Sequence, residues 1–390
     1  MLNFEFYNPT RIVFGKYTLD NLDKLIPAKA NVLIVSYGIK EMSGLIDRVK
    51  TVLGDRKVLE FGGIEPNPHY ETCVKAMELA RNENIDYLVA VGGGSVIDAT
   101  KFISLGSNYD GDPAELLQFD GAPLSSEVIN KIKKIVPFGT VLTLAATGSE
   151  MNDGSVITYG KMKPLIQDEN IFPRFSILDP TITFTVPKKQ VANGLIDSFV
   201  HAAEQYITYP VDARIQDRMA EGIMQTLIEV GPTTVAEPEN YDARANFVWC
   251  STLALNRLIG AGVPQDWTAH LIGLELTVLF GIDHGPSVGI MLLPVMDVLR
   301  EQKRAKLLQY AERVWHIESG SEDEKIDLAI QKTREFFESL GVKMRLSEYG
   351  IGADRAQDIV DLLKEHKYTA MSENGSVTLE VSRKIIEKAL

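Results

Sequence analysis

Apolar positions in the first half of the chain form short compact runs that alternate with longer amphipathic stretches. The compact runs predict strands buried on both faces of a parallel sheet, because such strands are apolar at nearly every position. In the stretches between them, apolar residues recur every three or four positions, as on one face of a helix. Strands are predicted at Asn31–Ser36, Lys57–Phe61, Tyr87–Val91, Lys134–Val141 and Phe175–Leu178, and helices at Ser43–Leu53, Tyr70–Asn82 and Val96–Leu105. This alternation is typical of a parallel, doubly wound sheet.

From about Pro187 the β-branched runs disappear and long amphipathic stretches replace them. Thr185 with Pro187 favours a helix start, because proline suits the first helical turn. Further helices are predicted at Ala213–Val230, Tyr241–Leu258, Asp266–Leu279, Arg304–Trp315, Ile326–Leu340 and Ala353–Glu365. The pattern therefore predicts an α/β amino-terminal domain at residues 1–185, followed by an all-α carboxy-terminal domain at residues 186–390.

Composition excludes several classes of partner. The chain has 390 residues and a formal net charge of −13, so neither nucleic acid nor an anionic membrane surface is an expected partner. No apolar run reaches the roughly 18 residues of a membrane span. The start, MLNFEFYNPTRIVFG, alternates like a strand and lacks the features of a signal peptide. Cys73 and Cys250 are expected to be buried thiols without a disulfide, and the cytoplasm is the expected compartment.

Four residues in the second half suggest one metal site. Asp197 and His201 are four residues apart in IDSFVHAAEQ, which stacks them on one helical face. His270 closes PQDWTAH, and His284 stands in FGIDHGPSV, so three of the six histidines of the chain join this pattern. A lone helical histidine is more often a core or surface residue. Buried histidine and aspartate need partners, however, and one shared Fe²⁺ or Zn²⁺ satisfies all four.

Glu204 follows Asp197 by seven residues and falls on the same helical face. It can orient a metal-binding histidine from outside the metal site, or it can be an ordinary solvated glutamate. The sequence leaves both interpretations open.

A glycine-rich turn in the first half suggests a phosphate site. VAVGGGSVIDATK places Gly92–Ser95 between a strand and a helix, where close backbone approach and free N–H groups suit a pyrophosphate. The motif is neither GxGxxG nor a Walker loop, and a plain tight turn fits the pattern about as well. In TLAATGSE, Thr147 and Ser149 either contact phosphate or ribose or merely cap a helix.

Taken together, the motifs resemble the iron-containing, group III metal-dependent alcohol dehydrogenases, in particular the butanol dehydrogenase and aldehyde reductase branch. The resemblance covers essentially the whole chain. It is carried by FGGIEPNP at Phe61–Pro68, VGGGSVIDATK at Val91–Lys101, TLAATGSE at Thr143–Glu150, ILDP at Ile177–Pro180, VANGLIDSFVHAAEQY at Val191–Tyr206 and VPQDW…H…DHG at Val263–Gly285.

The resemblance implies an amino-terminal dinucleotide-binding domain, a carboxy-terminal metal-binding domain and an active site in the cleft between them. It makes Asp197, His201, His270 and His284 the metal ligands and catalytic residues, and it implies a homodimer whose amino-terminal strands pair. The implied cofactor contacts are Gly93, Gly94 and Ser95 at the pyrophosphate, with Asp98 nearby, and Asn67, Thr143, Thr147 and Lys163.

Two departures from the family pattern change the expectation. Tyr37 stands where NAD-preferring members commonly carry an aspartate for the adenosine ribose, so no carboxylate repels a 2′-phosphate, and Lys40 can attract one. We therefore expect NADP(H), with NAD(H) as the alternative. Leu274 stands where many members carry a histidine that faces the nicotinamide, which leaves water or a ribose hydroxyl as the expected proton carrier.

The expected reaction is hydride transfer between NADP(H) and a small aliphatic alcohol or aldehyde such as butanal, on a Lewis-acid metal. One alternative is a polyol oxidoreductase like glycerol dehydrogenase, or a protein like dehydroquinate synthase, and the VPQDW and DHG segments argue against both. A second alternative is a catalytically silent metal- or nucleotide-binding relative, in which Leu274 marks lost activity. The complete set of four ligands argues against it.

Overall fold

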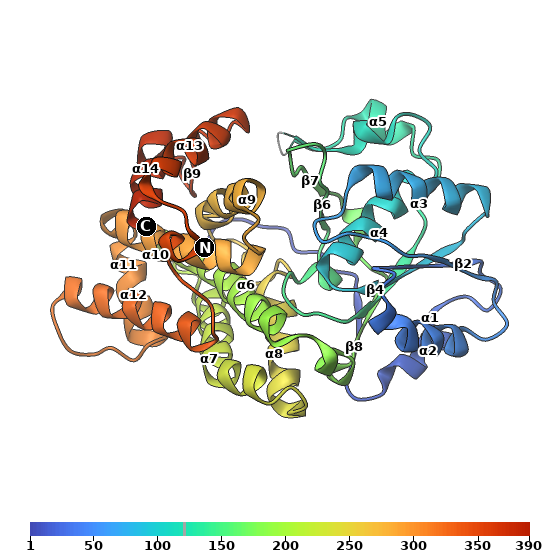
Figure 1. The fold of residues 1–390 in the computed structure, drawn as a ribbon, viewed down its shortest axis with the longest axis horizontal. Coiled ribbons are helices and arrows are strands. Elements are labelled where there is room, and N and C mark those ends of the chain that lie inside the picture. The colour runs from blue at the N-terminus through green and yellow to red at the C-terminus, as the bar shows by residue number, and fades with distance from the viewer. Residues whose placement is uncertain (120–121) are drawn as a thin grey trace. The chain divides into compact units, whose positions relative to one another are not determined.

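The computed structural model describes residues 1–119 and 122–390 (Figure 1). The chain divides into two compact units. One is Tyr7–Thr185, and the other joins Met1–Phe6 to Val186–Leu390. Each unit is built around its own secondary structure.

The first unit is organised by a six-stranded parallel sheet with the order β1-β8-β5-β4-β2-β3. The strands are β1 (Arg11–Phe14), β2 (Val32–Ser36), β3 (Val58–Phe61), β4 (Tyr87–Gly92), β5 (Phe138–Leu142) and β8 (Phe175–Leu178). The helices are α1 (Leu22–Leu25), α2 (Ser43–Leu53), α3 (Tyr70–Asn82), α4 (Gly94–Gly106) and α5 (Ser126–Asn130), and β6 (Gly154–Val156) and β7 (Leu165–Gln167) form an antiparallel hairpin. The predicted parallel sheet is confirmed.

Helices cover both faces of this sheet (Figure 1). Successive side chains of a strand point to opposite faces. Val32 and Ile34 of β2 therefore join Val89 of β4 in one core with residues of α1 and α2, such as Leu22 and Val49. The neighbouring strand residues lie on the face that α4 covers and are equally buried, which explains the nearly continuous apolar runs of the sequence.

Two boundaries in this unit differ from the prediction by more than one residue. The strand predicted at residues 134–141 starts only at Phe138, because Pro137 has no N–H to donate to a neighbouring strand. The helix predicted from Val96 starts at Gly94, so the expected turn shrinks to the single residue Gly93, which caps the helix. The start of the chain alternates like a strand, but only Arg11–Phe14 pairs in the sheet.

The second unit is helical. Its helices are α6 (Lys188–Tyr206), α7 (Arg214–Ala236), α8 (Tyr241–Ala254), α9 (Thr268–Phe280), α10 (His284–Val298), α11 (Arg300–Arg313), α12 (Glu322–Ser339), α13 (Ala356–Glu365) and α14 (Leu379–Lys388). One antiparallel pair of two-residue strands, β9 (Ala370–Met371) and β10 (Val377–Thr378), precedes α14.

Short 3₁₀ turns occur in both units. In the first unit they lie at Thr18–Asn21, Lys40–Met42, Pro113–Leu116, Ser149–Met151, Glu169–Ile171 and Pro180–Thr185, and in the second at Leu346–Tyr349 and Ala353–Arg355.

Helix α6 lies at the centre of this unit, with α7, α8 and α10 packed against it (Figure 1). Every residue from Val191 to Tyr206 is buried. A helix buried on all sides normally has apolar residues all round. The polar residues of α6 therefore need partners inside the protein, and they define the site described below.

Prolines account for the main surprises in the helical unit. Helix α10 was not predicted, because Pro286 and Pro294 interrupt its pattern. Pro286 lies in the first turn, where its missing N–H has no intrahelical acceptor in any case. Helix α7 continues through Pro232 to Ala236, six residues beyond its predicted end. Helix α14 was not predicted either.

Both cysteines are free and buried, as predicted, and burial raises the pKa of both thiols. Among the helices of the described residues, none is long and apolar enough to cross a membrane.

Candidate metal centre and cofactor site

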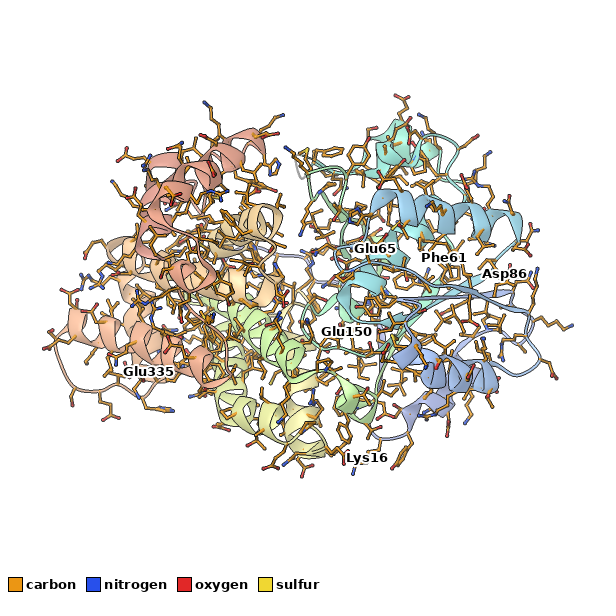
Figure 2. The ribbon with its side chains drawn as sticks, in the orientation of Figure 1. Lys16, Phe61, Glu65, Asp86, Glu150 and Glu335 are labelled. Atoms are coloured by element: carbon orange, nitrogen blue, oxygen red, sulfur yellow. The ribbon has the colours of Figure 1, made fainter. Side chains whose placement is uncertain are left out.

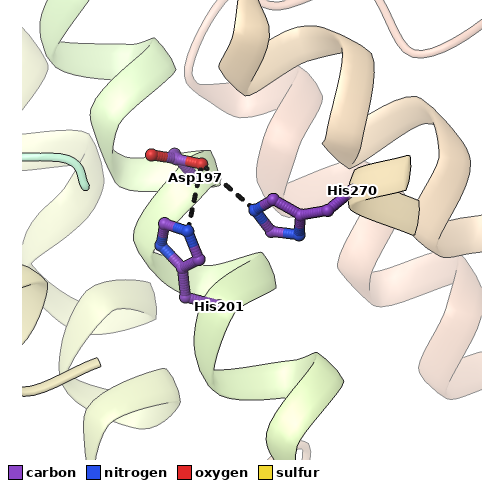
Figure 3. Close-up of side chains that lie close together, drawn as sticks. All are labelled: Asp197, His201 and His270. Atoms are coloured by element: carbon purple, nitrogen blue, oxygen red, sulfur yellow. Dashed lines mark ion pairs between the residues drawn. The ribbon is translucent and has the colours of Figure 1, made fainter. Parts of the chain in front are cut away.

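Three helices bring the predicted metal ligands together, and Figure 3 shows three of the four ligands, Asp197, His201 and His270. Asp197 and His201 lie on successive turns of α6, as their spacing predicted. His270 lies in the first turn of α9, and His284 is the first residue of α10.

One carboxylate oxygen lies close to all three imidazoles. Asp197 Oδ1 lies 3.7 Å from His201 Nε2, 3.7 Å from His270 Nε2 and 3.4 Å from His284 Nε2. These distances are too long for good hydrogen bonds. They match the separation of about 3.4 Å between ligand atoms in a tetrahedral site with bonds of roughly 2.1 Å. The ligand atoms of Asp197, His201 and His270 all lie within 4.8 Å of one another, and His284 is outside this tightest group.

Burial and charge at the site favour a cation. Asp197 and His201 are only 2% and 4% exposed, and Asp197 Oδ1 and His270 Nε2 have no hydrogen-bond partner in the described part of the chain. Burial lowers the pKa of His201 to about 3, so this imidazole is neutral. Burial alone would raise the pKa of Asp197, but the nearby imidazoles lower it well below its usual range. A buried carboxylate oxygen surrounded by three imidazole nitrogens fits a divalent metal ion.

Glu204 contacts the ring nitrogen of His270 that is not directed at Asp197. Its Oε2 contacts His270 Nδ1, and its Oε1 accepts the backbone N–H of Ala269 at 2.7 Å. Burial opposes protonation of His270, but the Glu204 and Asp197 carboxylates raise the pKa of this imidazole to about 9. Because Glu204 is 1% exposed, the alternative of a solvated glutamate is wrong. The contact fixes the ring so that Nε2 faces Asp197.

The sequence did not single out the residues that position His284. Asp283 precedes it, and Asp283 Oδ2 accepts a hydrogen bond from Asn193 Nδ2 at 2.8 Å and pairs with Lys189 Nζ at 2.8 Å. A Cβ on Gly285 would lie 2.2 Å from the backbone oxygen of Asn193, so only glycine allows α10 to start so close to α6. Asn193 lies four residues before Asp197, and this helical spacing is the signal that could have revealed it.

The predicted cofactor residues gather at the carboxyl edge of the sheet in the first unit. The chain order reverses between β2 and β4, since β3 lies beyond β2 on one side and β5 and β8 lie beyond β4 on the other. Ligands of open α/β sheets bind outside the strand ends at such a reversal. Tyr37 directly follows β2, and Gly93 directly follows β4.

Asn67 links several of these residues. It has a positive φ of 57°, and its backbone N–H donates to Ser95 Oγ at 3.2 Å. Its side-chain Oδ1 accepts Lys163 Nζ at 2.9 Å, and its carbonyl accepts the Thr158 hydroxyl at 3.0 Å. Earlier in the same loop, Glu65, which is labelled in Figure 2, anchors the loop to α3. Its carboxylate accepts the Thr72 hydroxyl at 2.6 Å.

Two other predicted cofactor contacts, Thr143 and Thr147, lie beside the glycine turn at Gly92–Gly94. The backbone N–H of Thr143 donates to the Gly92 carbonyl at 3.0 Å, and Thr147 packs so closely on Gly94 that a Cβ there would lie 2.5 Å from Thr147 Oγ1. The Thr147 hydroxyl also accepts the N–H of Ser149 at 3.2 Å. The residue that caps the 3₁₀ turn Ser149–Met151 is Gly148, however, so neither Thr147 nor Ser149 is a helix cap as the alternative expected.

The carboxylate of Asp98 is hydrogen-bonded to other residues of the first unit. Its carboxylate accepts the Ser149 hydroxyl at 2.6 Å and the Val156 N–H at 3.0 Å. These bonds let Asp98 connect α4 to the segments that carry TLAATGSE and β6.

Comparison with known proteins accords with this geometry. The iron-containing alcohol dehydrogenase model matches residues 9–180, and the model of the carboxy-terminal part of that family matches residues 191–389. The chain is 51% identical over 395 residues to the NADPH-dependent aldehyde reductase YqhD of Escherichia coli, with all of both chains covered. It is 36% identical to NADH-dependent butanol dehydrogenase A of Clostridium acetobutylicum, with 92% of each covered.

Solved structures agree with the sequence comparison. The crystal structure of E. coli YqhD superposes with a TM-score of 0.94 at 50% identity, covering 100% of this chain and 99% of the other. The resemblance predicted from the motifs is thus confirmed. The chain belongs to the iron-containing alcohol dehydrogenase family of oxidoreductases.

Proposed function

We propose that this enzyme is a metal-dependent aldehyde reductase that transfers a hydride from NADPH to small aliphatic aldehydes such as butanal, and that it also runs in the alcohol-oxidising direction. The observation that carries the proposal is the approach of three imidazoles to the single buried oxygen Asp197 Oδ1. The relatives support it, because their names describe an NADPH-dependent aldehyde reductase and NADH-dependent butanol dehydrogenases.

In this proposal Asp197, His201, His270 and His284 hold the metal. The family name favours Fe²⁺, and Zn²⁺ accepts the same ligands. When bound, the metal polarises the carbonyl oxygen of the substrate and the nicotinamide supplies the hydride. The chain contributes orientation. Glu204 fixes the ring of His270, and Asp283 with Asn193 fixes the start of α10 at His284.

The same proposal assigns dinucleotide binding to residues 7–185. Gly93, Gly94 and Ser95 would face the pyrophosphate, with Asn67, Thr143, Thr147 and Lys163 around it. NADPH is favoured over NADH because Ser36, at the end of β2, is followed by Tyr37 and not by a carboxylate, and because Lys40 is exposed nearby. Leu274 lies one turn after His270 on α9, so an aliphatic side chain stands where other members place an imidazole.

An assay of cofactor consumption tests the proposed function. Purified protein loaded with Fe²⁺ is mixed with butanal and either NADPH or NADH, and a parallel reaction offers glycerol with NADP⁺ or NAD⁺. We expect rapid oxidation of NADPH by butanal, slower oxidation of NADH and little glycerol oxidation. Faster glycerol turnover would favour the polyol oxidoreductase, and no turnover with any pair, despite bound metal, would favour the silent relative.

We also propose a homodimer formed through the amino-terminal segments, working in the cytoplasm. Strand β1 stands at the edge of its sheet, where its outer hydrogen-bonding groups can pair with a second copy. The preceding residues Leu2, Phe4, Phe6 and Tyr7 are between 42% and 56% exposed. Light scattering should give twice the mass of the chain, and replacing Phe4 and Phe6 with serine should halve it. A wild-type monomer would refute the dimer and leave the proposed reaction untouched.

A further inference from the structure

The histidines of the metal centre differ in how their rings are held. His270 has Glu204 on the ring nitrogen that is not directed at Asp197. His201 Nδ1, in contrast, is buried and has no hydrogen-bond partner among the described residues. A histidine that binds a metal almost always donates a hydrogen bond from its second nitrogen, and this bond orients the ring. The ring of His201 is therefore oriented by contacts of another kind.

The indole of Trp267 supplies such contacts. It lies edge to face against His201, with 6.2 Å between the ring centroids and 63° between the ring planes. It lies in the same way against His270, at 5.2 Å and 76°. The two imidazoles stack on each other, with their centroids 4.6 Å apart. Aromatic rings attract one another in these arrangements, so one indole restrains both imidazoles.

The backbone of Trp267 has a conformation that bulky residues rarely adopt. Its φ of 65° and ψ of 6° lie in the left-handed region. The residues on both sides are fixed, because the N–H of Asp266 donates to the Glu204 carbonyl at 2.9 Å and the N–H of Thr268 donates to Asp266 Oδ1 at 3.0 Å. Strained residues persist where their surroundings hold them, and they cluster at functional sites. The strain therefore points to a role for Trp267 beyond packing.

The polar edge of the indole is bonded within its own loop. Trp267 Nε1 donates to Gln265 Oε1 at 3.0 Å, and Gln265 Nε2 donates to the Gly260 carbonyl at 3.2 Å. A Cβ on Gly260 would lie 2.5 Å from Gln265 Nε2, so the amide is closely packed. These bonds fix the indole, and its apolar ring is the part that meets the imidazoles.

We propose that Trp267 is a positioning residue of the metal centre, whose ring contacts take the place of a hydrogen bond to His201 Nδ1 and keep His201 Nε2 directed toward Asp197. The inference rests on the proposed function, because it needs a metal held by Asp197 and the three histidines. It adds to that function a residue that is not itself a ligand. It also gives a reason for a bulky aromatic residue at a strained position beside α9.

Replacing Trp267 with leucine tests the role of the ring. Leucine keeps apolar bulk before α9 but has no flat ring to set against the imidazoles. Loss of a residue that orients a ligand costs about 10–100-fold in metal affinity, and we expect a loss of that size for Co²⁺, measured by chelator competition. The visible spectrum of bound Co²⁺ depends on the geometry of its ligands, so it should shift as well. Trp267→Phe keeps an aromatic ring and should bring both the affinity and the spectrum back close to wild type.

Trp249→Leu is the matched control. Trp249 lies on α8 in the same unit and is 37% exposed. Its replacement should change neither the affinity for Co²⁺ nor the spectrum. Thermal unfolding of the metal-free proteins separates positioning from packing, because a purely structural role for Trp267 would lower the unfolding temperature and leave the Co²⁺ spectrum of the folded protein unchanged. If Trp267→Leu does not fold, Trp267→Met is used, since methionine is also apolar and has no ring.

Wild-type affinity and spectrum in the folded leucine or methionine variant would overturn the inference. It would also fall if Trp267→Phe behaved like Trp267→Leu, because the bond to Gln265 and not the ring would then be the important contact. A wild-type protein that binds neither Co²⁺ nor Fe²⁺ would remove the proposed metal centre together with this inference. Normal wild-type binding with unaltered variants removes the role of Trp267 alone.

Discussion

Asp197→Asn is expected to give a folded protein that no longer retains its metal and has almost no aldehyde reductase activity. Asparagine keeps the shape of the side chain but removes the charge on the oxygen that all three imidazoles approach. Loss of a residue that only supports a ligand already costs about 10–100-fold in metal affinity, so loss of the ligand itself should cost more than about 100-fold. Because a Lewis-acid metal supplies several kcal/mol to the transition state, turnover should fall by about three orders of magnitude or more.

A graded series makes this prediction specific. Glu204→Gln removes the charge behind His270 and keeps all four ligands, so metal affinity should fall by only about 10–100-fold. His316→Ala removes an exposed histidine outside the site and should change neither affinity nor turnover. Metal content by mass spectrometry, affinity by chelator competition and folding by circular dichroism are measured on all three variants. Stoichiometric metal with full turnover in Asp197→Asn would rule out the proposed ligand set.

Lys303→Met is expected to destabilise the helical unit severely. Lys303 in α11 is 0% exposed at its side chain, and its Nζ lies 2.9 Å from Asp266 Oδ2 and 2.8 Å from Glu373 Oε2. It also donates to the Ile207 carbonyl at 2.9 Å. Removing the lysine leaves two buried carboxylates without a counter-charge. Breaking a buried ion pair in this way costs about 3–5 kcal/mol, and urea unfolding should show a loss of that size.

The control for Lys303 is Lys384→Met. Lys384 pairs with Glu380 on α14, but both side chains are largely exposed to solvent. Exposed pairs of this kind contribute little, so the unfolding curve should not move measurably. Unfolding curves for Lys303→Met that overlay those of wild type would show that the buried cluster is not what holds α9, α11 and the β9–β10 segment together.

Local spacing explains what the sequence could predict. The apolar runs that form β2 and β4 are buried on both faces, and such strands can be predicted from the sequence without any tertiary information. The four-residue spacing of Asp197 and His201 placed them on one helical face, and the scarcity of histidine drew His270 and His284 into the same pattern. Most of the metal centre could therefore be proposed before the fold was known.

Contacts between distant segments explain what the sequence could not predict. Nothing local relates Asp283 to Asn193, or Lys303 to Glu373, because tertiary packing alone brings them together. Helix α10 was missed because it contains Pro286 and Pro294, and proline usually ends a helix. Pro286 is tolerated because it lies in the first turn. Tyr37 was assigned a role from its position after β2. A pattern of residue types does not show that its hydroxyl lies beside the next glycine turn, 3.2 Å from where a Cβ on Gly93 would stand.

Metal titration of the wild-type enzyme tests the central claim most directly. Protein stripped of metal with a chelator is titrated with Fe²⁺ under anaerobic conditions while the oxidation of NADPH by butanal is followed. The account predicts no activity without metal and a linear rise that ends at one Fe²⁺ per chain, since one set of four ligands binds one ion. Full activity of the stripped protein, or a rise that continues well beyond one ion per chain, would contradict it.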